Sequence, residues 1–188
     1  MSVHSGKQCQ LICHPDTPAR AVRSIAVEVD LSFDEGFALR FVVDGEIGGI
    51  LLPPGEGELV IADGGTDGLW QSSCFEAFLT EEGQPDYTEF NYAPDGRWAC
   101  YQFDDYRSLL RTDDLAPWRM AVEREPGHYA LSIEPGIFPE TGARLALSAV
   151  IEEVDGTKSY WALAHPPGKP DFHHPDCFAL TLGAPDAA

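Results

Sequence analysis

The chain has 188 residues, 44% of them hydrophobic and 11% aromatic, and its 12 basic and 31 acidic residues give a formal net charge of −19. This length is enough for one domain with a substantial core, so we expect a single domain over residues 1–188 with its core at about 21–183. Because such a negative field repels nucleic acid and anionic membranes, we exclude both classes of partner.

The cysteines and the apolar runs indicate a reducing, aqueous compartment. The first twenty residues lack the unbroken apolar core of a signal peptide, and no apolar run is long enough to span a membrane, so we expect a cytoplasmic protein. Five cysteines is an odd number, which favours free thiols over a disulfide framework. Cys9, Cys13 and His14 have no second pair at zinc spacing, so we expect no zinc site.

The first predicted elements form a hairpin. Apolar residues alternate with polar or small ones over 25–33 and again over 37–43, and Asp34-Glu35-Gly36 supplies the turn. The 18 glycines and 15 prolines are spread along the whole chain and divide it into many short segments. This punctuation favours an all-β fold, an antiparallel β-sandwich with at most short helical turns.

A Gly-rich acidic segment follows over 44–67. Its tip, Asp63-Gly64-Gly65-Thr66-Asp67, offers carboxylates and backbone carbonyls that could hold Ca²⁺, although the spacing matches no familiar calcium loop. The alternative is a solvated acidic turn. The sequence therefore specifies no cofactor, and a structural Ca²⁺ site in this segment is left as an alternative.

The central stretch, 68–107, predicts three successive strands, at 69–80, 87–92 and 97–103. The last two flank Ala93-Pro94-Asp95-Gly96, in which Pro94 presets φ for the second turn position and Gly96 closes the turn. We therefore predict a β-hairpin at this point.

Strand parity places Glu89 and Asn91 on one face of the second of these strands. In the strand before it, Glu76 is the only carboxylate of an apolar run, and a buried carboxylate requires a partner or a ligand. Arg97 and Glu89 are the nearby candidates. Trp70 has the same parity as Glu76 but lies about 20 Å along the strand if the backbone stays extended. Two interpretations stay open: a polar and aromatic site on one sheet face, or a structural ion pair between Glu76 and Arg97.

Beyond residue 103 the chain continues with two more hairpins and a last strand. The segment 104–117 has mild helical character, and we expect a loop with at most a short helical turn. Trp98, Trp118 and Trp161 alternate within strands and are expected in the core. The predicted strands lie at 119–124, 129–134, 144–154, 158–164 and 177–182.

The segment 165–176 is rich in Pro, Gly and His and is long for an irregular loop in a compact domain, which favours a functional role. We place the second half of the site here. His173 and His174 are adjacent, so an extended backbone points them apart. The alternative is a stiff covering loop whose imidazoles hydrogen-bond to the backbone.

Two long motifs resemble a known family. One is Leu-Trp-x3-Cys-Phe-Glu-Ala-Phe-Leu from Leu69, followed by Tyr-x-Glu-Phe-Asn-Tyr-x-Pro-x-Gly-x-Trp from Tyr87. The other, from Tyr160 to Pro175, contains His-Pro-Pro-Gly-Lys-Pro-Asp-Phe-His-His-Pro. Over about 25–182 the chain resembles the DOMON-like domains, the superfamily that includes the family-9 carbohydrate-binding modules, and in particular a bacterial branch of it. The resemblance implies a jelly-roll-like β-sandwich of about ten strands that binds a small ligand, either a sugar or haem.

In the sugar-binding modules of this family a Trp, a Glu and an Arg form the binding pattern, and Trp70, Glu76 and Arg97 match it. A second Trp of those modules has no counterpart; its place falls at 171–174, where another ring would substitute less well. We therefore expect a non-catalytic domain that binds a sugar or a sugar-containing metabolite. The expected ligand-binding residues are Trp70, Glu76, Glu89, Asn91, Arg97, Phe172, His173 and His174.

Two other functions stay open, and neither the ligand nor the oligomeric state is specified by the sequence. Haem-binding relatives use Met and His as axial ligands, and here Met120 with His173 or His174 is the available set. A glycoside-active enzyme could use Glu76 and Glu89 as paired carboxylates. The sequence has no Ser-His-Asp signature and no Gly-rich phosphate loop, so we expect no catalysis.

Overall fold

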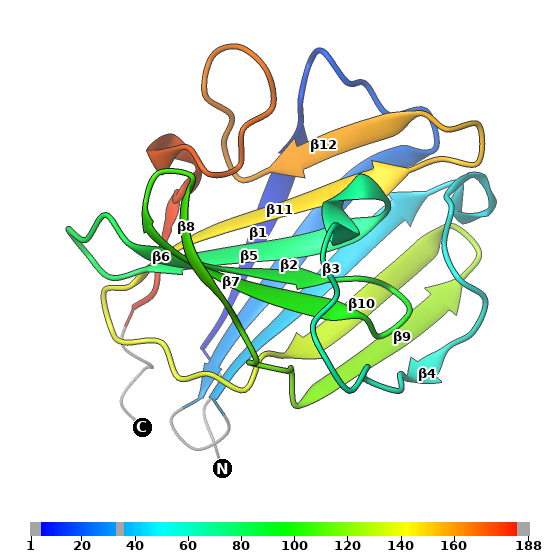
Figure 1. Cartoon of the computed structure of the whole chain (residues 1–188). Helices are drawn as coiled ribbons and strands as arrows, with labels where there is room; N and C mark the ends of the chain where they lie inside the picture. Colours follow the sequence, from blue (N-terminus) through cyan, green and yellow to red (C-terminus); the bar gives the residue numbers. More distant parts are fainter. Residues whose placement is uncertain (1–4, 33–35, 184–188) are drawn as a thin grey trace.

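The computed structural model describes residues 5–32 and 36–183 (Figure 1). Over these residues the chain is all-β and antiparallel, with thirteen strands and three short 3-10 helices. No helix of the described residues is long and apolar enough to cross a membrane. The strands are β1 Ser5–Cys13, β2 Val22–Ser32, β3 Gly36–Gly45, β4 Gly57–Glu58, β5 Cys74–Thr80, β6 Tyr87–Tyr92, β7 Trp98–Asp105, β8 Ser108–Asp113, β9 Arg119–Glu125, β10 His128–Glu134, β11 Arg144–Glu152, β12 Lys158–Ala162 and β13 Leu180–Thr181. The helices are η1 Ile47–Gly49, η2 Leu69–Gln71 and η3 Pro175–Cys177.

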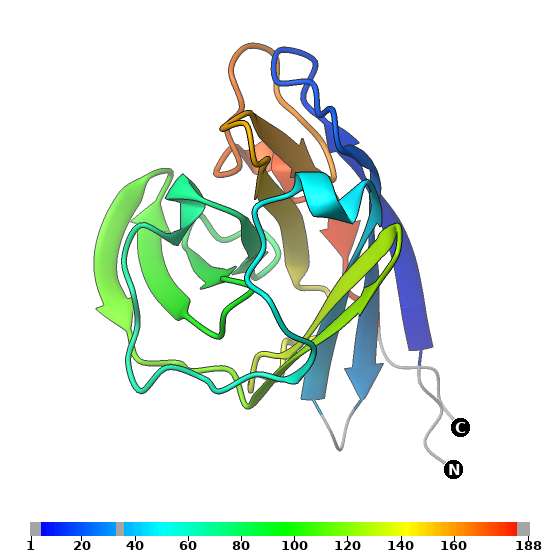
Figure 2. The ribbon, with the colours of Figure 1, turned by 90° about the vertical axis from the view of Figure 1, so that its right-hand side faces the viewer.

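The strands form one continuous sheet in the order β4-β9-β10-β3-β2-β1-β12-β11-β5-β6-β7-β8, with β13 also beside β11. Strand β1 joins the two halves, because its residues 5–11 pair with β2 while Ile12 and Cys13 pair with β12. The sheet curls into a half-barrel whose halves face each other (Figure 1, Figure 2). The all-β antiparallel class is confirmed, while the strand number is thirteen where about ten were expected, and the curled half-barrel is not clearly a jelly-roll-like sandwich of two sheets.

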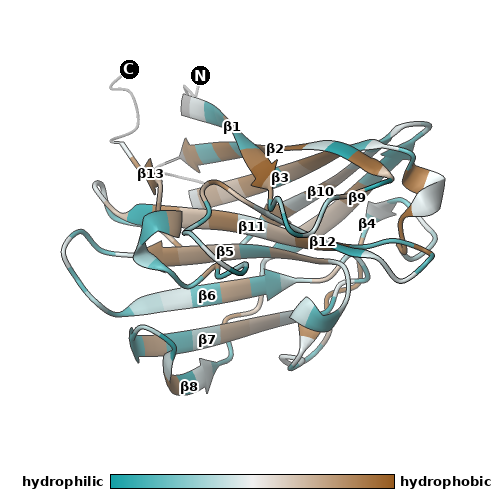
Figure 3. Cartoon of the chain, turned by 90° about the horizontal axis from the view of Figure 1, so that it is seen from above, coloured by the Kyte–Doolittle hydropathy of each residue, from teal (hydrophilic) through white to brown (hydrophobic). Residues whose placement is uncertain are grey.

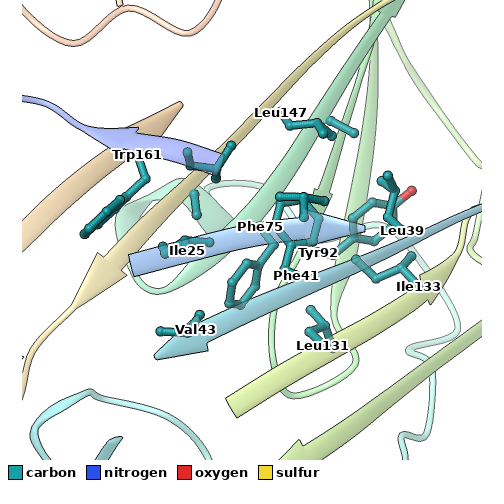
Figure 4. Close-up of a cluster of buried hydrophobic side chains, with 14 of the residues drawn as sticks. Ile25, Leu39, Phe41, Val43, Phe75, Tyr92, Leu131, Ile133, Leu147 and Trp161 are labelled. Carbon is teal, nitrogen blue, oxygen red and sulfur yellow. The ribbon is translucent and has the colours of Figure 1, made fainter. Parts of the chain in front are cut away.

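Alternating apolar residues from both halves meet in one core. The rings of Phe41 in β3 and Phe75 in β5 lie 5.2 Å apart between centroids, and Phe75 stacks with Tyr129 of β10 at 6.3 Å. Figure 4 shows Ile133 and Leu147, from opposite halves, in the same cluster. Hydrophobic residues concentrate on the strands and hydrophilic ones in the loops (Figure 3). Burial of apolar side chains from strands of both halves therefore holds the curled sheet closed.

The predicted hairpin between β6 and β7 is confirmed. The Ala93 N–H donates to the Arg97 carbonyl at 2.9 Å, and the Gly96 N–H donates to the Ala93 carbonyl at 3.2 Å. Gly96 has φ +90°, and a Cβ there would lie 2.2 Å from the Val60 carbonyl oxygen, so glycine is required twice over. Strands β2 and β3 also pair as predicted, while most of their predicted turn lies outside the described residues.

Two predicted elements differ from the structure. The strand expected at 69–80 begins at Cys74, because Gly68, with φ +78°, turns the chain into η2 first. The loop expected at 104–117 contains β8, which pairs with β7. The side chains of β8 are almost all exposed, so no alternating burial pattern marks it in the sequence, and its hydrogen bonds to β7 define it instead.

Two of the three tryptophans expected in the core are there. Trp98 and Trp161 are buried, and the indole N–H of Trp98 donates to the Ala62 carbonyl at 2.9 Å. Trp118 is 59% exposed and packs edge-on against Phe138. It precedes β9 instead of lying within a strand, so the alternation that predicted its burial does not apply.

Candidate functional site

Strand β5 alternates between two environments. Phe75 and Ala77 belong to the core between the halves of the sheet, while Cys74 and Phe78 belong to a second apolar cluster on the opposite face. Part of that face is covered by the C-terminal segment through Phe178. The part left open is a cavity of about 380 Å³. It is lined by Trp70, Glu76, Phe78, Glu89, Tyr101, Phe103, Arg107, Leu109, Val150, Tyr160, Pro170, Phe172 and His173.

Strand register places two carboxyl groups at the floor of this cavity. Glu76 lies between Ser148 of β11 and Asn91 of β6, and Glu89 of β6 lies opposite Tyr101 of β7. Small residues complete these rows, namely Ala99, Ala146 and Ala162. Because these methyl groups stand low on the sheet, the carboxyl groups remain reachable from the cavity.

Glu76 is 2% exposed, and the Ser148 hydroxyl donates to its Oε2 at 3.0 Å. Burial, together with the charge of Glu89, raises the pKa of this carboxyl to about 8 against the opposing effect of the Ser148 hydrogen bond. No lysine or arginine pairs with Glu76 within the described chain. The group therefore keeps a proton through most of the neutral range.

Glu89 is 5% exposed and accepts a hydrogen bond from the Asn91 amide at 2.7 Å. Burial raises its pKa to about 7, although the Asn91 hydrogen bond and the charge of Arg107 act in the opposite direction. The Cys74 thiol donates to the Asn91 carbonyl oxygen at 3.7 Å, which fixes the orientation of the amide. Both carboxyl groups of the floor are therefore buried and have raised pKa values.

A chain of polar groups connects Glu89 to the mouth of the cavity. The Arg107 backbone N–H donates to the Tyr87 hydroxyl at 3.1 Å, and that hydroxyl lies 2.8 Å from Nδ1 of His173. Burial, reinforced by the charge of Arg107, lowers the pKa of His173 to about 4, so its ring is neutral at pH 7. The other ring nitrogen of His173, Nε2, lies 3.7 Å from Oε2 of Glu89.

Aromatic rings form the walls of the cavity. Trp70 is 44% exposed and meets Tyr101 edge-on at 6.0 Å, and the Tyr101 hydroxyl donates to Asp67 at 2.9 Å. On the other side Phe172 lies 6.0 Å from Tyr160. These planes are held by their own contacts, so the walls exist before any ligand enters.

Hydrogen bonds and an ion pair connect the C-terminal loop to the turn between β7 and β8. We call the three residues that make them, Tyr106, Arg107 and Asp171, the Asp171 latch. Arg107, with φ +54°, directs its guanidinium to Asp171 at 2.7 Å, and the Tyr106 hydroxyl donates to the other Asp171 oxygen. Burial alone would raise the pKa of Asp171, but the hydrogen bonds from Tyr106 and Arg107 outweigh it and lower that pKa. The latch holds His173 and Phe172 over the sheet.

The structure brings together five of the eight residues expected at the site, namely Trp70, Glu76, Glu89, Phe172 and His173. Asn91 lies beneath them, fully buried. The structural ion pair of Glu76 with Arg97, one of the two interpretations left open by the sequence, is not formed, because Arg97 lies at the hairpin tip and pairs with Asp95 at 2.8 Å. His174 points away from His173, as predicted, and its Nδ1 accepts from the Asp176 N–H at the start of η3.

Eight lining residues were missed by sequence reasoning, among them Tyr101, Phe103, Arg107 and Tyr160. The first two were within reach, because the hairpin turn at 93–96 sets Tyr101 opposite Glu89 and Phe103 opposite Tyr87. Arg107 has no such signal, since it depends on the turn before β8 and on a partner 64 residues away.

The structure does not assemble the metal or haem ligands considered from the sequence. Met120 is fully buried in the core between the halves, whereas His173 lines the cavity on the other face. Asp67, at the acidic tip expected as a calcium candidate, accepts the Tyr101 hydroxyl. Among the described residues no group of three or more His, Cys, Asp or Glu side chains is arranged to hold a metal ion.

A larger cavity of about 470 Å³ lies on the outer face of the other half of the sheet. Both of its arginines form ion pairs, Arg40 with Glu28 and Glu123 and Arg119 with Glu134, and Lys7 Nζ donates to the Thr181 carbonyl. No aromatic residue lines it. It therefore offers no flat aromatic surface for a sugar ring, and the smaller cavity, which has such surfaces beside two buried carboxyl groups, is the better candidate site.

No model of a protein family matches the chain, and neither does any curated protein compared with it. A solved structure, described as that of "a putative carbohydrate-binding protein from Bacteroides uniformis", is similar to it with a TM-score of 0.58 and 15% sequence identity. The match covers 91% of this chain and 83% of that chain. The two chains share a fold. At this identity the likeness concerns the fold alone.

Proposed function

We propose that this chain is a non-catalytic carbohydrate-binding domain of the DOMON-like type, which takes a sugar or a sugar-containing metabolite into the cavity over β5, β6 and β7. The observation that carries the proposal is the pair of buried carboxyl groups, Glu76 and Glu89, at the floor of a cavity walled by aromatic rings. The description of the similar solved structure points to the same class of ligand.

The cavity has the two kinds of surface that a pyranose needs. A sugar ring has an apolar C–H face, which an indole or phenol plane can cover, and Trp70 and Tyr101 offer such planes. Its edge carries hydroxyls, which donate to carboxyl oxygens such as those of Glu76 and Glu89. A volume of about 380 Å³ suits one or two sugar rings.

A glycoside-active enzyme is the second candidate, because two neighbouring carboxyl groups with raised pKa values are also what a general acid requires. In a hydrolase one carboxylate must be charged near neutral pH to act as base or nucleophile. Here both carboxyl groups are buried without a cation beside them, and this favours binding over catalysis. Release of chromophore from aryl glycosides, abolished in Glu76→Gln, would establish the enzyme instead.

The test of binding is a titration with mono- and disaccharides, followed by tryptophan fluorescence and by calorimetry. We expect Trp70→Ala to weaken binding by at least about tenfold, because a stacked ring contributes on the order of 1.5 kcal/mol. Trp118→Ala is the matched control, since Trp118 is also exposed but lies outside the cavity. Equal affinities in the two variants, or no saturable binding by the unmodified protein, would refute the proposal.

A further inference from the structure

Each carboxyl group at the cavity floor accepts a hydrogen bond from the protein at only one of its two oxygen atoms. Glu76 accepts from Ser148 at Oε2 and Glu89 accepts from Asn91 at Oε1, both neutral donors. Glu76 Oε1 and Glu89 Oε2 accept no hydrogen bond from the described part of the chain, and the nearest donor to the latter is the His173 ring at 3.7 Å. Because both residues line the cavity, these two oxygen atoms are the acceptors that the floor has left for a ligand.

Among the described residues no lysine or arginine forms an ion pair with Glu76 or Glu89, although the charge of Arg107 lowers the pKa of Glu89. Arg107 is the one lysine or arginine that lines the cavity, and its guanidinium is bound to Asp171 of the latch. His173 is neutral at pH 7, since burial lowers its pKa to about 4. The site thus has two acidic groups, aromatic walls and no available positive charge, in a chain whose net charge is −19.

We propose that the ligand of this cavity carries a primary ammonium group, and that an amino sugar with a free amine is preferred over its neutral, N-acetylated and acidic counterparts. This inference rests on the proposed function, because it names the ligand class of the same site.

An ammonium group has enough hydrogen-bond donors for both acceptor oxygens of the floor, and its positive charge is opposite to that of the carboxylates. It has three donors and no acceptor, so it can donate to Glu76 Oε1 and Glu89 Oε2 together. It supplies the counter-ion that the two carboxyl groups lack, and the faces of Trp70 and Tyr101 attract a cation as well. A uronic or sialic acid would bring a further negative charge to a floor that is already acidic.

Binding of an ammonium ion should release protons from the floor. Folded and empty, Glu76 and Glu89 have raised pKa values, so near pH 7 they hold protons that a bound cation would expel. The other ionisable groups that face them are Cys74 of β5, Tyr87 of β6, Tyr101 of β7, Tyr160 of β12, and Arg107, Asp171 and His173 at the mouth. The raised pKa values of Cys74, Tyr87 and Tyr101 and the lowered pKa of His173 keep these four neutral at pH 7, so the released protons come from the two glutamates.

The experiment is calorimetry at neutral pH, in two buffers of different ionisation enthalpy, with the whole chain. The probes are glucosamine, N-acetylglucosamine and glucose, the corresponding galactose series, glucuronic acid, and cyclohexylamine as an amine that is not a sugar. We expect the better amino sugar to bind at least about tenfold more tightly than its neutral and N-acetylated partners, with proton release, because a hydrogen bond to a charged group exceeds a neutral one by on the order of 1.4 kcal/mol.

Two isosteric variants and a control complete the test. Glu76→Gln and Glu89→Gln should abolish the amine preference and the proton release, while a neutral sugar that binds loses far less. Glu123→Gln removes one exposed carboxylate outside the cavity and should change neither quantity. Thermal unfolding of each variant checks that it is folded.

The outcomes separate this inference from the proposed function. Neutral or N-acetylated sugars that bind as tightly as the amines would overturn the inference and leave the proposed function standing. Cyclohexylamine binding without any saccharide binding would overturn the proposed function and the assignment to amino sugars, and would leave an amine site. The absence of binding by every probe would overturn both.

Discussion

Burial of Glu76 disfavours its charged form in the folded state, and this makes the free energy of unfolding depend on pH. Its pKa is raised from 4.5 to about 8 on folding, mainly by burial. Between these values the folded protein holds a proton that the unfolded chain has released, so the free energy of unfolding falls as pH rises through this interval and levels off above it.

Replacement of Glu76 by Gln removes that dependence. We expect the variant to resemble the unmodified protein at about pH 5 and to exceed its stability by on the order of 2 kcal/mol at about pH 8, measured by denaturant unfolding. Glu123→Gln, on the exposed face of β9, should show no such trend. A gap between Glu76→Gln and the unmodified protein that is constant from pH 5 to pH 8 would contradict the burial of the charge.

For single residues, the sequence predicts that the Glu76 carboxyl needs a partner, but it does not predict which residue that partner is. An isolated carboxylate in the run Cys74-Phe75-Glu76-Ala77-Phe78 signals a site, and the structure places Glu76 in the cavity. The partner predicted from proximity in the sequence, Arg97, pairs with Asp95 instead. The actual donor, Ser148, is 72 residues away and becomes a neighbour only through the register of β5 with β11.

Among the elements, the Asp171 latch joins two segments that are irregular by themselves. Its ion pair is partly exposed, so it contributes at most about 1 kcal/mol to global stability. Its local effect is larger, because it holds the loop that carries Phe172 and His173 over the cavity.

We expect Asp171→Asn to speed amide hydrogen exchange in residues 165–176 and to raise the dissociation rate of a bound saccharide, with little change in the unfolding midpoint. Asp155→Asn is the matched control, because it removes a similar ion pair, with Arg20, outside the cavity. Unchanged exchange in the loop of Asp171→Asn would mean that packing of Phe172 alone holds it in place.

Elements were predictable where a local signal coincides with the tertiary structure. The β6–β7 hairpin has its turn chemistry in four residues, and its position follows from them. Strand β8 and helix η2 have no such signal: the first is an exposed edge strand, and the second is set by the left-handed Gly68. The turn at η2 brings Trp70 beside Glu76, whereas an extended strand would have separated them by about 20 Å.

For the whole molecule, the all-β antiparallel class followed from composition and alternation, but the closure of the sheet did not. The curl depends on β1, whose ends pair with β2 and β12, and no sequence pattern distinguishes a strand with two such neighbours from one at an edge. The sequence therefore predicted the antiparallel β-class but not the half-barrel form of the sheet.

The charge of the whole molecule predicts its response to salt. With a net charge of −19, mutual repulsion of the carboxylates opposes the compact state, and the surface ion pairs are mostly exposed and contribute little. We expect the unfolding temperature to rise between ~20 mM and ~300 mM NaCl as repulsion is screened. A fall over this range would show that the surface ion pairs outweigh the repulsion.

The most direct test of the account is where a saccharide binds, which backbone amide chemical shifts can map during a titration. We predict saturable shifts in β5, β6 and β7, around Trp70 and in the loop that carries His173, the elements that enclose the smaller cavity. Shifts around Lys7, Arg40 and Arg119 instead would place the binding site in the larger cavity of the other half and would contradict the proposed site. The absence of any saturable shift would contradict carbohydrate binding itself.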